Sequence, residues 1–162
     1  IYMNHIYIVL YKQMEVTMDV IDFKNIIWNN SRKISEKITS LINTLCEHHG
    51  ITTLQGRILI EIQHHGAHTI GTLASTLNIA GTNVSTMCKK LESKGFIERV
   101  RDEGDERVVK VALSEKGIKV VEEINEELIE KITYAILGES DQTLHEIING
   151  LQKLNQILEK MN

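Results

Sequence analysis

Proline is absent from this chain of 162 residues, and only two cysteines are present. With 42% hydrophobic and 25% charged residues, the composition is that of a globular chain and not of a fibrous or disordered one. Cys46 and Cys88 lie far apart without a paired-cysteine motif, which argues against a disulfide framework or a zinc knuckle. The length suits a single small domain with dimerising arms.

The chain also lacks the segments typical of membrane proteins and of common enzymes. Its longest uninterrupted apolar stretch, Ile6 to Tyr11, is far shorter than the roughly 20 residues of a membrane-spanning helix. No run of Lys or Arg precedes that stretch, as it would in a signal peptide. A Gly-rich phosphate loop, a nucleophile elbow and a His-Glu-x-x-His motif are all missing. We therefore expect a cytoplasmic protein that is not an enzyme and needs no cofactor.

The net charge is -4, but the charges are unevenly distributed. Residues 50–114 contain eight Lys/Arg and seven Asp/Glu, a balance of +1, whereas the other residues contain ten against fifteen, a balance of -5. Most basic residues of the middle segment fall between Lys89 and Lys110. Clustering on one face would allow contact with phosphates, and the alternative is an ordinary solvated face.

Both flanks have the periodicity of long helices. In residues 20–49 apolar residues recur at spacings of three, four and seven, and Ser114 can cap another helix that lasts until Gly138. A last helix begins at Ser140 and carries a heptad pattern at Ile147, Leu151, Leu154, Leu158 and Met161. Such a pattern is typical of a helix that packs lengthwise on another. Residues 1–19 are left unassigned.

The centre contains three shorter predicted helices. Thr52 and Gln55 form a capping box at the start of the first, and Thr69 can cap the second, which ends near Asn78. The third begins within residues 80–82 and has two distinct faces. Its apolar face carries Val84, Met87, Cys88 and Leu91, and its polar face carries Thr82, Ser85, Thr86, Lys89 and Ser93.

After Gly95 the period changes to that of β-strands. Residues 97–101 and 107–113 are short, β-branched and alternating, and Asp-Glu-Gly-Asp-Glu separates them. A helix, a turn and a helix with a polar outer face, followed by such a hairpin, form a winged helix-turn-helix. The predicted fold is mainly α with a small β-hairpin (α+β). We expect a dimerisation helix at 20–49, a winged helix-turn-helix lobe at 50–114 and two dimerisation helices within 115–162.

In sequence, the lobe resembles the MarR (multiple antibiotic resistance regulator) family of transcription factors from about Leu54 to Gly117. The resemblance rests on Leu73-Ala74 with Leu77, on Val84-Ser85, and on the segments Leu-Glu-Ser-Lys-Gly-Phe-Ile-Glu-Arg (91–99), Arg-Asp-Glu-Gly-Asp-Glu-Arg-Val-Val (101–109) and Leu-Ser-Glu-Lys-Gly (113–117). Asp105 and Arg107 match the Asp-x-Arg signature of the family wing. Glu103 departs from the family, which often has Pro at that position.

The resemblance implies a homodimer that binds a pseudo-palindromic DNA site and is often released by a small ligand. It also implies that Arg107 enters the minor groove while Asp105 helps to hold the wing. A helix fits the major groove, where hydroxyl and Lys side chains reach base edges and phosphates. The residues expected to serve DNA binding are Thr82, Ser85, Thr86, Lys89, Lys90, Arg99, Arg101, Asp105 and Arg107. For Arg99 and Arg101, the alternative is surface ion pairs with Asp102 and Asp105.

A ligand-responsive repressor has two alternatives, a protein-interaction module and a metal-sensing regulator. A winged helix can serve as a protein-interaction module without DNA contact, and the basic residues on one surface argue against this. The histidines at 48, 49, 64, 65 and 68 could converge on a metal ion, but solvated or capping roles are favoured and no metal site is assigned. Cys88 is expected in the core, and Cys46, near the carboxyl end of its helix, lacks the environment of a redox-sensing thiol.

Overall fold

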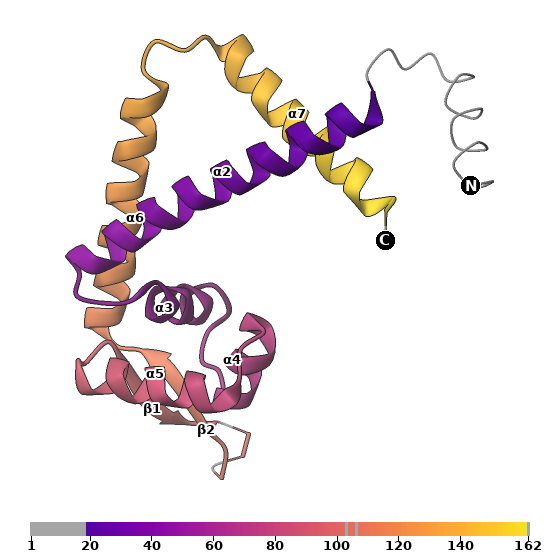
Figure 1. The fold of residues 1–162 in the computed structure, drawn as a ribbon. Coiled ribbons are helices and arrows are strands. Elements are labelled where there is room, and N and C mark those ends of the chain that lie inside the picture. Colours follow the sequence, from indigo (N-terminus) through magenta and orange to yellow (C-terminus); the bar gives the residue numbers. More distant parts are fainter. Residues whose placement is uncertain (1–18, 103, 106, 162) are drawn as a thin grey trace, which may run out of the picture.

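The computed structural model describes residues 19–102, 104–105 and 107–161. In this part of the chain a compact lobe lies at the base of three long helices, as Figure 1 shows. The fold is mainly helical with one small hairpin, as the sequence predicted. In chain order the elements are α2 (Val20–His48), α3 (Thr53–His65), α4 (Ile70–Leu77), α5 (Gly81–Ser93), β1 (Ile97–Arg101), β2 (Val109–Leu113), α6 (Glu115–Ile136) and α7 (Asp141–Glu159).

Side-chain caps set most of the helix starts. The capping box at α3 is confirmed: the Thr52 hydroxyl accepts a hydrogen bond from the Gln55 amide (3.3 Å), and the Gln55 side chain accepts one from the Thr52 amide (3.0 Å). Ser114 and Ser140 cap α6 and α7 through the amides three residues further on. Local sequence therefore fixes these boundaries without help from packing.

The hydrophobic core lies inside the lobe. It takes side chains from the last turns of α2, from α3, α4 and α5, from the hairpin and from the first half of α6. The most deeply buried large side chains are Leu45, Ile58, Leu59, Leu73, Leu91 and Val84. Gln55 is buried among them, and its capping hydrogen bond satisfies the carbonyl oxygen of its side chain. This core holds α5 in place with one face turned inward.

Gly117 allows α6 to begin directly against the end of α5. A Cβ at this position would lie 1.9 Å from the carbonyl oxygen of Phe96, which is backbone. The same carbonyl accepts the amide hydrogen of Ser114 (3.1 Å). The absence of a side chain is therefore a requirement of the close approach.

The hairpin is shorter than predicted at its second strand. The expected strand 107–113 begins instead at Val109, which is paired with Arg101. Beyond this pair, the Asp102 amide donates to the Val108 carbonyl (2.9 Å) and the Val108 amide donates to the Asp105 carbonyl (2.8 Å). The second of these bonds is a turn bond within the loop, so residues 107 and 108 do not continue the strand. Arg107 therefore belongs to the loop and not to the strand. The departure at position 103 lies outside the described residues.

A short third pairing anchors the hairpin to the helices. His68, between α3 and α4, exchanges two backbone hydrogen bonds with Val111 of β2 (3.1 and 2.8 Å). Val111 is buried. The second strand of the hairpin, β2, is therefore hydrogen-bonded to the segment between α3 and α4.

The long helices expose apolar side chains over much of their length. No residue of α7 is buried, and its heptad residues Ile147, Leu151 and Leu158 are 55%, 52% and 42% exposed. The far parts of α2 and α6 expose further ones, among them Ile34, Ile38, Ile129 and Ile132. Within the described residues, no helix combines the length and the hydropathy needed to cross a membrane.

Candidate nucleic-acid interface

Helix α5 presents a polar face to solvent. Val84, Cys88 and Leu91 are fully buried and fix the rotation of the helix. The side chains opposite them are exposed, at Thr82, Thr86, Lys89 and Lys90, and Ser85 is half-buried. In Figure 1, α5 and the hairpin lie on the side of the lobe that is turned away from the long helices. The polar face of α5 that the sequence predicted is thus exposed to solvent.

The hydroxyl hydrogen of Thr86, on this face, is already engaged in a hydrogen bond. The Thr86 hydroxyl donates to the backbone carbonyl of Thr82 one turn earlier (2.9 Å). Its oxygen lone pairs remain available as acceptors. In the major groove an acceptor pairs with an exocyclic amino group of adenine or cytosine. Thr86 is therefore suited to accept a hydrogen bond from a base.

The wing carries a highly exposed arginine. The side chain of Arg107 is 92% exposed, and its Nε donates to Asp105 Oδ1 (3.1 Å). The backbone amide of Arg107 donates to the same oxygen (3.0 Å). Asp105 thus accepts hydrogen bonds from both the backbone and the side chain of Arg107, which the sequence predicted to contact DNA.

Sequence reasoning missed the role of Asp102 in this loop. Its Oδ1 accepts the amide hydrogens of Gly104 (2.9 Å) and Asp105 (3.2 Å), and its Oδ2 pairs with the ammonium group of Lys110 on β2. These interactions, led by the hydrogen bond from Lys110, hold the pKa of Asp102 below its ordinary value. A carboxylate two residues before a glycine was the available signal, because such residues bond their own turn.

Arg99 pairs with a residue that the sequence did not suggest. Its Nε lies 3.1 Å from one carboxylate oxygen of Glu92 and 3.2 Å from the other. Of the expected partners, Asp102 bonds the loop amides and Lys110 of β2, and Asp105 bonds Arg107. The ion pair joins β1 to the last turns of α5 and is substantially exposed on both sides. Arg101 is also exposed, on the last position of β1.

Comparison with known proteins identifies this arrangement. The family model for the transcriptional regulators SarA and Rot matches residues 40–124, slightly more than half of the chain. The chain belongs to the SarA/Rot family. The HTH-type transcriptional regulator YwhA of Bacillus subtilis is 32% identical over 104 residues, which are 62% of this chain and 75% of YwhA. The protein is thus a DNA-binding transcriptional regulator and not an enzyme.

Solved structures place this SarA/Rot regulator in the MarR-type winged-helix fold. A MarR family protein from Bacillus stearothermophilus superposes with a TM-score of 0.76 at 24% identity, covering 88% of this chain and 99% of that one. A mutant of MepR from S. aureus, solved with a bound oligodeoxyribonucleotide, gives a TM-score of 0.63 at 26% identity. That match covers 80% of this chain and 96% of MepR. The predicted resemblance to the MarR family is confirmed in the fold.

Both cysteines of the regulator are buried. Cys88 is fully buried on the inner face of α5, and burial raises its pKa to about 11. Burial also raises the pKa of Cys46, whose sulfur would lie 2.8 Å from a Cβ added at Gly56. A raised pKa disfavours the reactive thiolate. The core placement expected for Cys88 is confirmed, and Cys46 has the same character.

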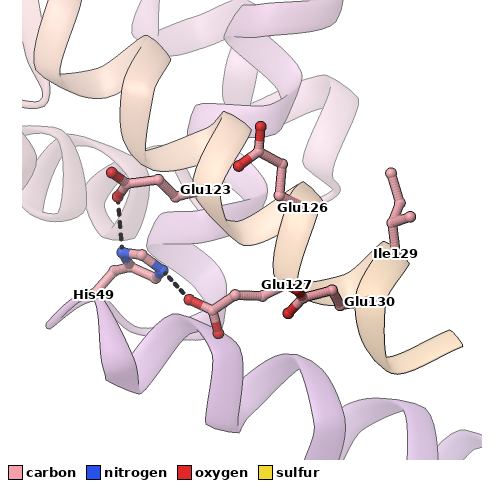
Figure 2. A pocket seen from close by; sticks show the side chains of 6 residues that line it. All are labelled: His49, Glu123, Glu126, Glu127, Ile129 and Glu130. Atoms are coloured by element: carbon pink, nitrogen blue, oxygen red, sulfur yellow. Dashed lines mark hydrogen bonds and ion pairs between the residues drawn. The ribbon is translucent and has the colours of Figure 1, made fainter. Parts of the chain in front are cut away.

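The histidines do not converge on one point. His48 and His49, at the end of α2, face glutamates of α6, whereas His65 and His68 face Glu61 of α3. In Figure 2, His49 lies between Glu123 (3.5 Å) and Glu127 (2.9 Å) beside an open cavity of about 510 Å³. Within the described residues, no group of three or more His, Cys, Asp or Glu side chains could hold a metal ion. The five histidines thus form no shared metal site in this part of the chain.

Proposed function

We propose that this regulator is a repressor that binds a pseudo-palindromic operator as a homodimer and responds to a small effector. The observation that carries the proposal is the exposed polar face of α5 beside the exposed Arg107 of the wing. A helix in the major groove with a basic wing tip at the next minor groove accounts for both. The lobe is assigned to residues 50–114 and dimerisation to residues 20–49 and 115–162.

The side chains divide into readers of bases and binders of phosphate. Thr82, Ser85 and Thr86 are short and lie on the first turns of the helix, from which base edges are reached. Lys89 and Lys90 lie in its later turns, where ammonium groups neutralise phosphates. Arg99, Arg101 and Arg107 are proposed to contact DNA from the hairpin, with Asp105 holding Arg107.

The exposed apolar faces of the long helices support the homodimer. Ile147, Leu151 and Leu158 of α7 lie on one face at heptad spacing, and about half of each side chain is exposed in the described structure. Exposed apolar stripes of this extent are typical of protein interfaces. A second copy supplies a matching stripe under two-fold symmetry, which also gives a dimeric DNA-binding protein its two half-sites.

The cavity beside His49 is a suitable place for the effector. It is lined by His49 from the end of α2 and by Glu123, Glu126, Glu127, Ile129 and Glu130 of α6. A volume of about 510 Å³ falls in the range of small-molecule sites. Because α6 follows directly from the wing, a ligand that shifts α6 relative to α2 would alter the position of the lobe.

Selection of bound duplexes from a random pool tests the proposal. We expect an enriched palindrome whose half-sites lie about 10 base pairs apart, centre to centre. Enrichment of a single half-site, or of no sequence, would refute the dimeric operator reading. A winged helix that only binds proteins would show no salt-dependent DNA affinity. Small molecules are then screened for release of the recovered operator.

The Arg107→Ala variant tests the wing contact on the recovered operator. Each neutralised phosphate contributes about 0.9 to the slope of log affinity against log salt concentration. Loss of one contact per subunit therefore lowers the magnitude of the slope by up to about 2 per dimer. We expect both the affinity and the slope to fall. Unchanged values of both would reduce the wing to a structural hairpin.

A further inference from the structure

We propose that Asp102 is a positioning residue for DNA binding, whose carboxylate holds the wing loop so that Arg107 is presented to DNA. This inference rests on the proposed DNA contact of Arg107. Asp102 directly follows β1 and is placed to act through the loop instead of through a contact of its own. It is an acidic residue on a DNA-binding surface, where its charge alone would oppose binding.

The hydrogen bonds run in one direction along the loop. Asp102 Oδ1 accepts the amide hydrogens of Gly104 and Asp105, which fixes the backbone of Asp105. Asp105 Oδ1 then accepts both the amide and the Nε hydrogens of Arg107. The carboxylate of Asp102 therefore determines where the carboxylate of Asp105 lies, and Asp105 determines how the guanidinium is turned.

Apart from the side-chain bonds, the loop is held by two backbone hydrogen bonds, from the Asp102 amide to the Val108 carbonyl and from the Val108 amide to the Asp105 carbonyl. None of the described loop residues (102, 104, 105, 107 and 108) belongs to the hydrophobic core. The side chain of Arg107 is 92% exposed, so no packing restricts its rotamers. A long side chain that is already oriented loses less conformational entropy on binding than a free one. The polar bonds of the loop are thus the available source of that orientation.

Lys110 anchors the arrangement to the sheet. It lies on β2 opposite Val100, and its ammonium group pairs with Asp102 Oδ2. Both side chains are partly shielded, with 33% of Lys110 and 23% of Asp102 exposed. An aspartate is ionised at neutral pH, and the same interactions extend the ionised state to lower pH because they lower the pKa of Asp102. The acceptor for the two amides is therefore present under ordinary conditions.

An electrostatic role and a positioning role predict opposite changes in operator affinity for the Asp102→Ala variant. Asp102→Ala removes a negative charge near the phosphates, so a purely electrostatic role predicts tighter binding of the operator. Positioning predicts weaker binding, by roughly 5- to 30-fold, because two hydrogen bonds that order the loop are lost. Glu98→Ala serves as the matched control: Glu98 is an exposed acid on β1 whose side chain makes no hydrogen bond or ion pair with another described residue. Its loss should leave affinity unchanged or slightly increased.

A double-mutant cycle with Arg107→Ala separates positioning from a general loss of folding. The full chain is titrated with the recovered operator, and thermal midpoints are measured for every variant. If Asp102 acts through Arg107, Asp102→Ala changes affinity by less than about twofold in the Arg107→Ala background. Asp102→Asn keeps an oxygen that can accept from Gly104 and Asp105, so we expect it to retain most of the parental affinity.

Each outcome decides the matter. Weaker binding by Asp102→Ala that disappears without Arg107, with rescue by Asp102→Asn, supports the proposal. An equal loss in both backgrounds, or binding by Asp102→Ala as tight as the parent, overturns the positioning role even where Arg107→Ala weakens binding. No loss in Arg107→Ala itself would remove the proposed wing contact and the positioning role with it.

Discussion

Replacement of Gly117 by alanine should destabilise the lobe although alanine is the better helix former. The new Cβ would lie 1.9 Å from the Phe96 carbonyl oxygen and 3.0 Å from its carbon. Separating Cβ and oxygen to even 3.0 Å requires a backbone shift of 3.0 - 1.9 = 1.1 Å, at the expense of the hydrogen bond from the Ser114 amide. Such overpacking costs about 1 to 3 kcal/mol, against about 0.4 to 1 kcal/mol gained from restricting the unfolded chain.

The middle of each range gives a net loss of about 1.3 kcal/mol, or roughly 3 to 5 °C in the thermal midpoint for a chain of this size. Circular dichroism at fixed protein concentration measures it, since the proposed dimerisation would make the midpoint concentration-dependent. Gly71→Ala is the matched control, because Gly71 also lies in the first turn of a lobe helix and its Cβ would meet Thr69 Oγ1 at 3.8 Å. That control should be neutral or stabilised. A Gly117→Ala midpoint equal to the parent's would refute the close-approach argument.

Three further perturbations have expected outcomes. Glu127→Gln should lower stability near neutral pH: hydrogen bonds from His48 and His49 depress the pKa of Glu127, so its stabilisation is present above the ordinary glutamate pKa and lost as pH falls through the lowered value. Urea titrations should thus converge for parent and variant in acid. Leu151→Asp should shift sedimentation towards monomer, whereas Asn149→Asp, on the other side of α7, should not. Thr86→Ala should change base preference in a selection, while Lys90→Ala should weaken all duplexes alike.

The helices were predictable because their signals are local. Thr52 and Gln55 satisfy each other's backbone amides within one turn, and the alternation of buried and exposed residues on α5 follows from its 3.6-residue period alone. The same reasoning placed Cys88 in the core. No long-range contact had to be known for any of these assignments.

The wing was harder to predict because its geometry depends on contacts across strands. The β-branched pattern at residues 107–113 favoured a strand from Arg107, but the turn bonds around Asp102 and Asp105 end the ladder at Val109. Glu92 as the partner of Arg99 depends on how α5 packs on β1, which alternation does not encode. Apolar residues at heptad spacing have the same sequence pattern whether a neighbouring segment or a second chain covers them. The sequence alone therefore could not show that the apolar face of α7 is exposed in the described structure.

The residues that follow α5 (94–96) and the start of α6 are joined by several bonds at one place. The Ser114 hydroxyl donates to the Gly95 carbonyl (2.6 Å), and the Lys116 ammonium donates to the Lys94 carbonyl (2.8 Å) while lying 4.6 Å from the centre of the Phe96 ring. Because Gly117 also touches Phe96, α6 cannot rotate about its first turn without moving the residues that follow α5. An effector or a dimer contact that tilts α6 would therefore be transmitted directly to the polar face of α5. This junction gives the proposed effector response a physical route to the DNA-binding surface.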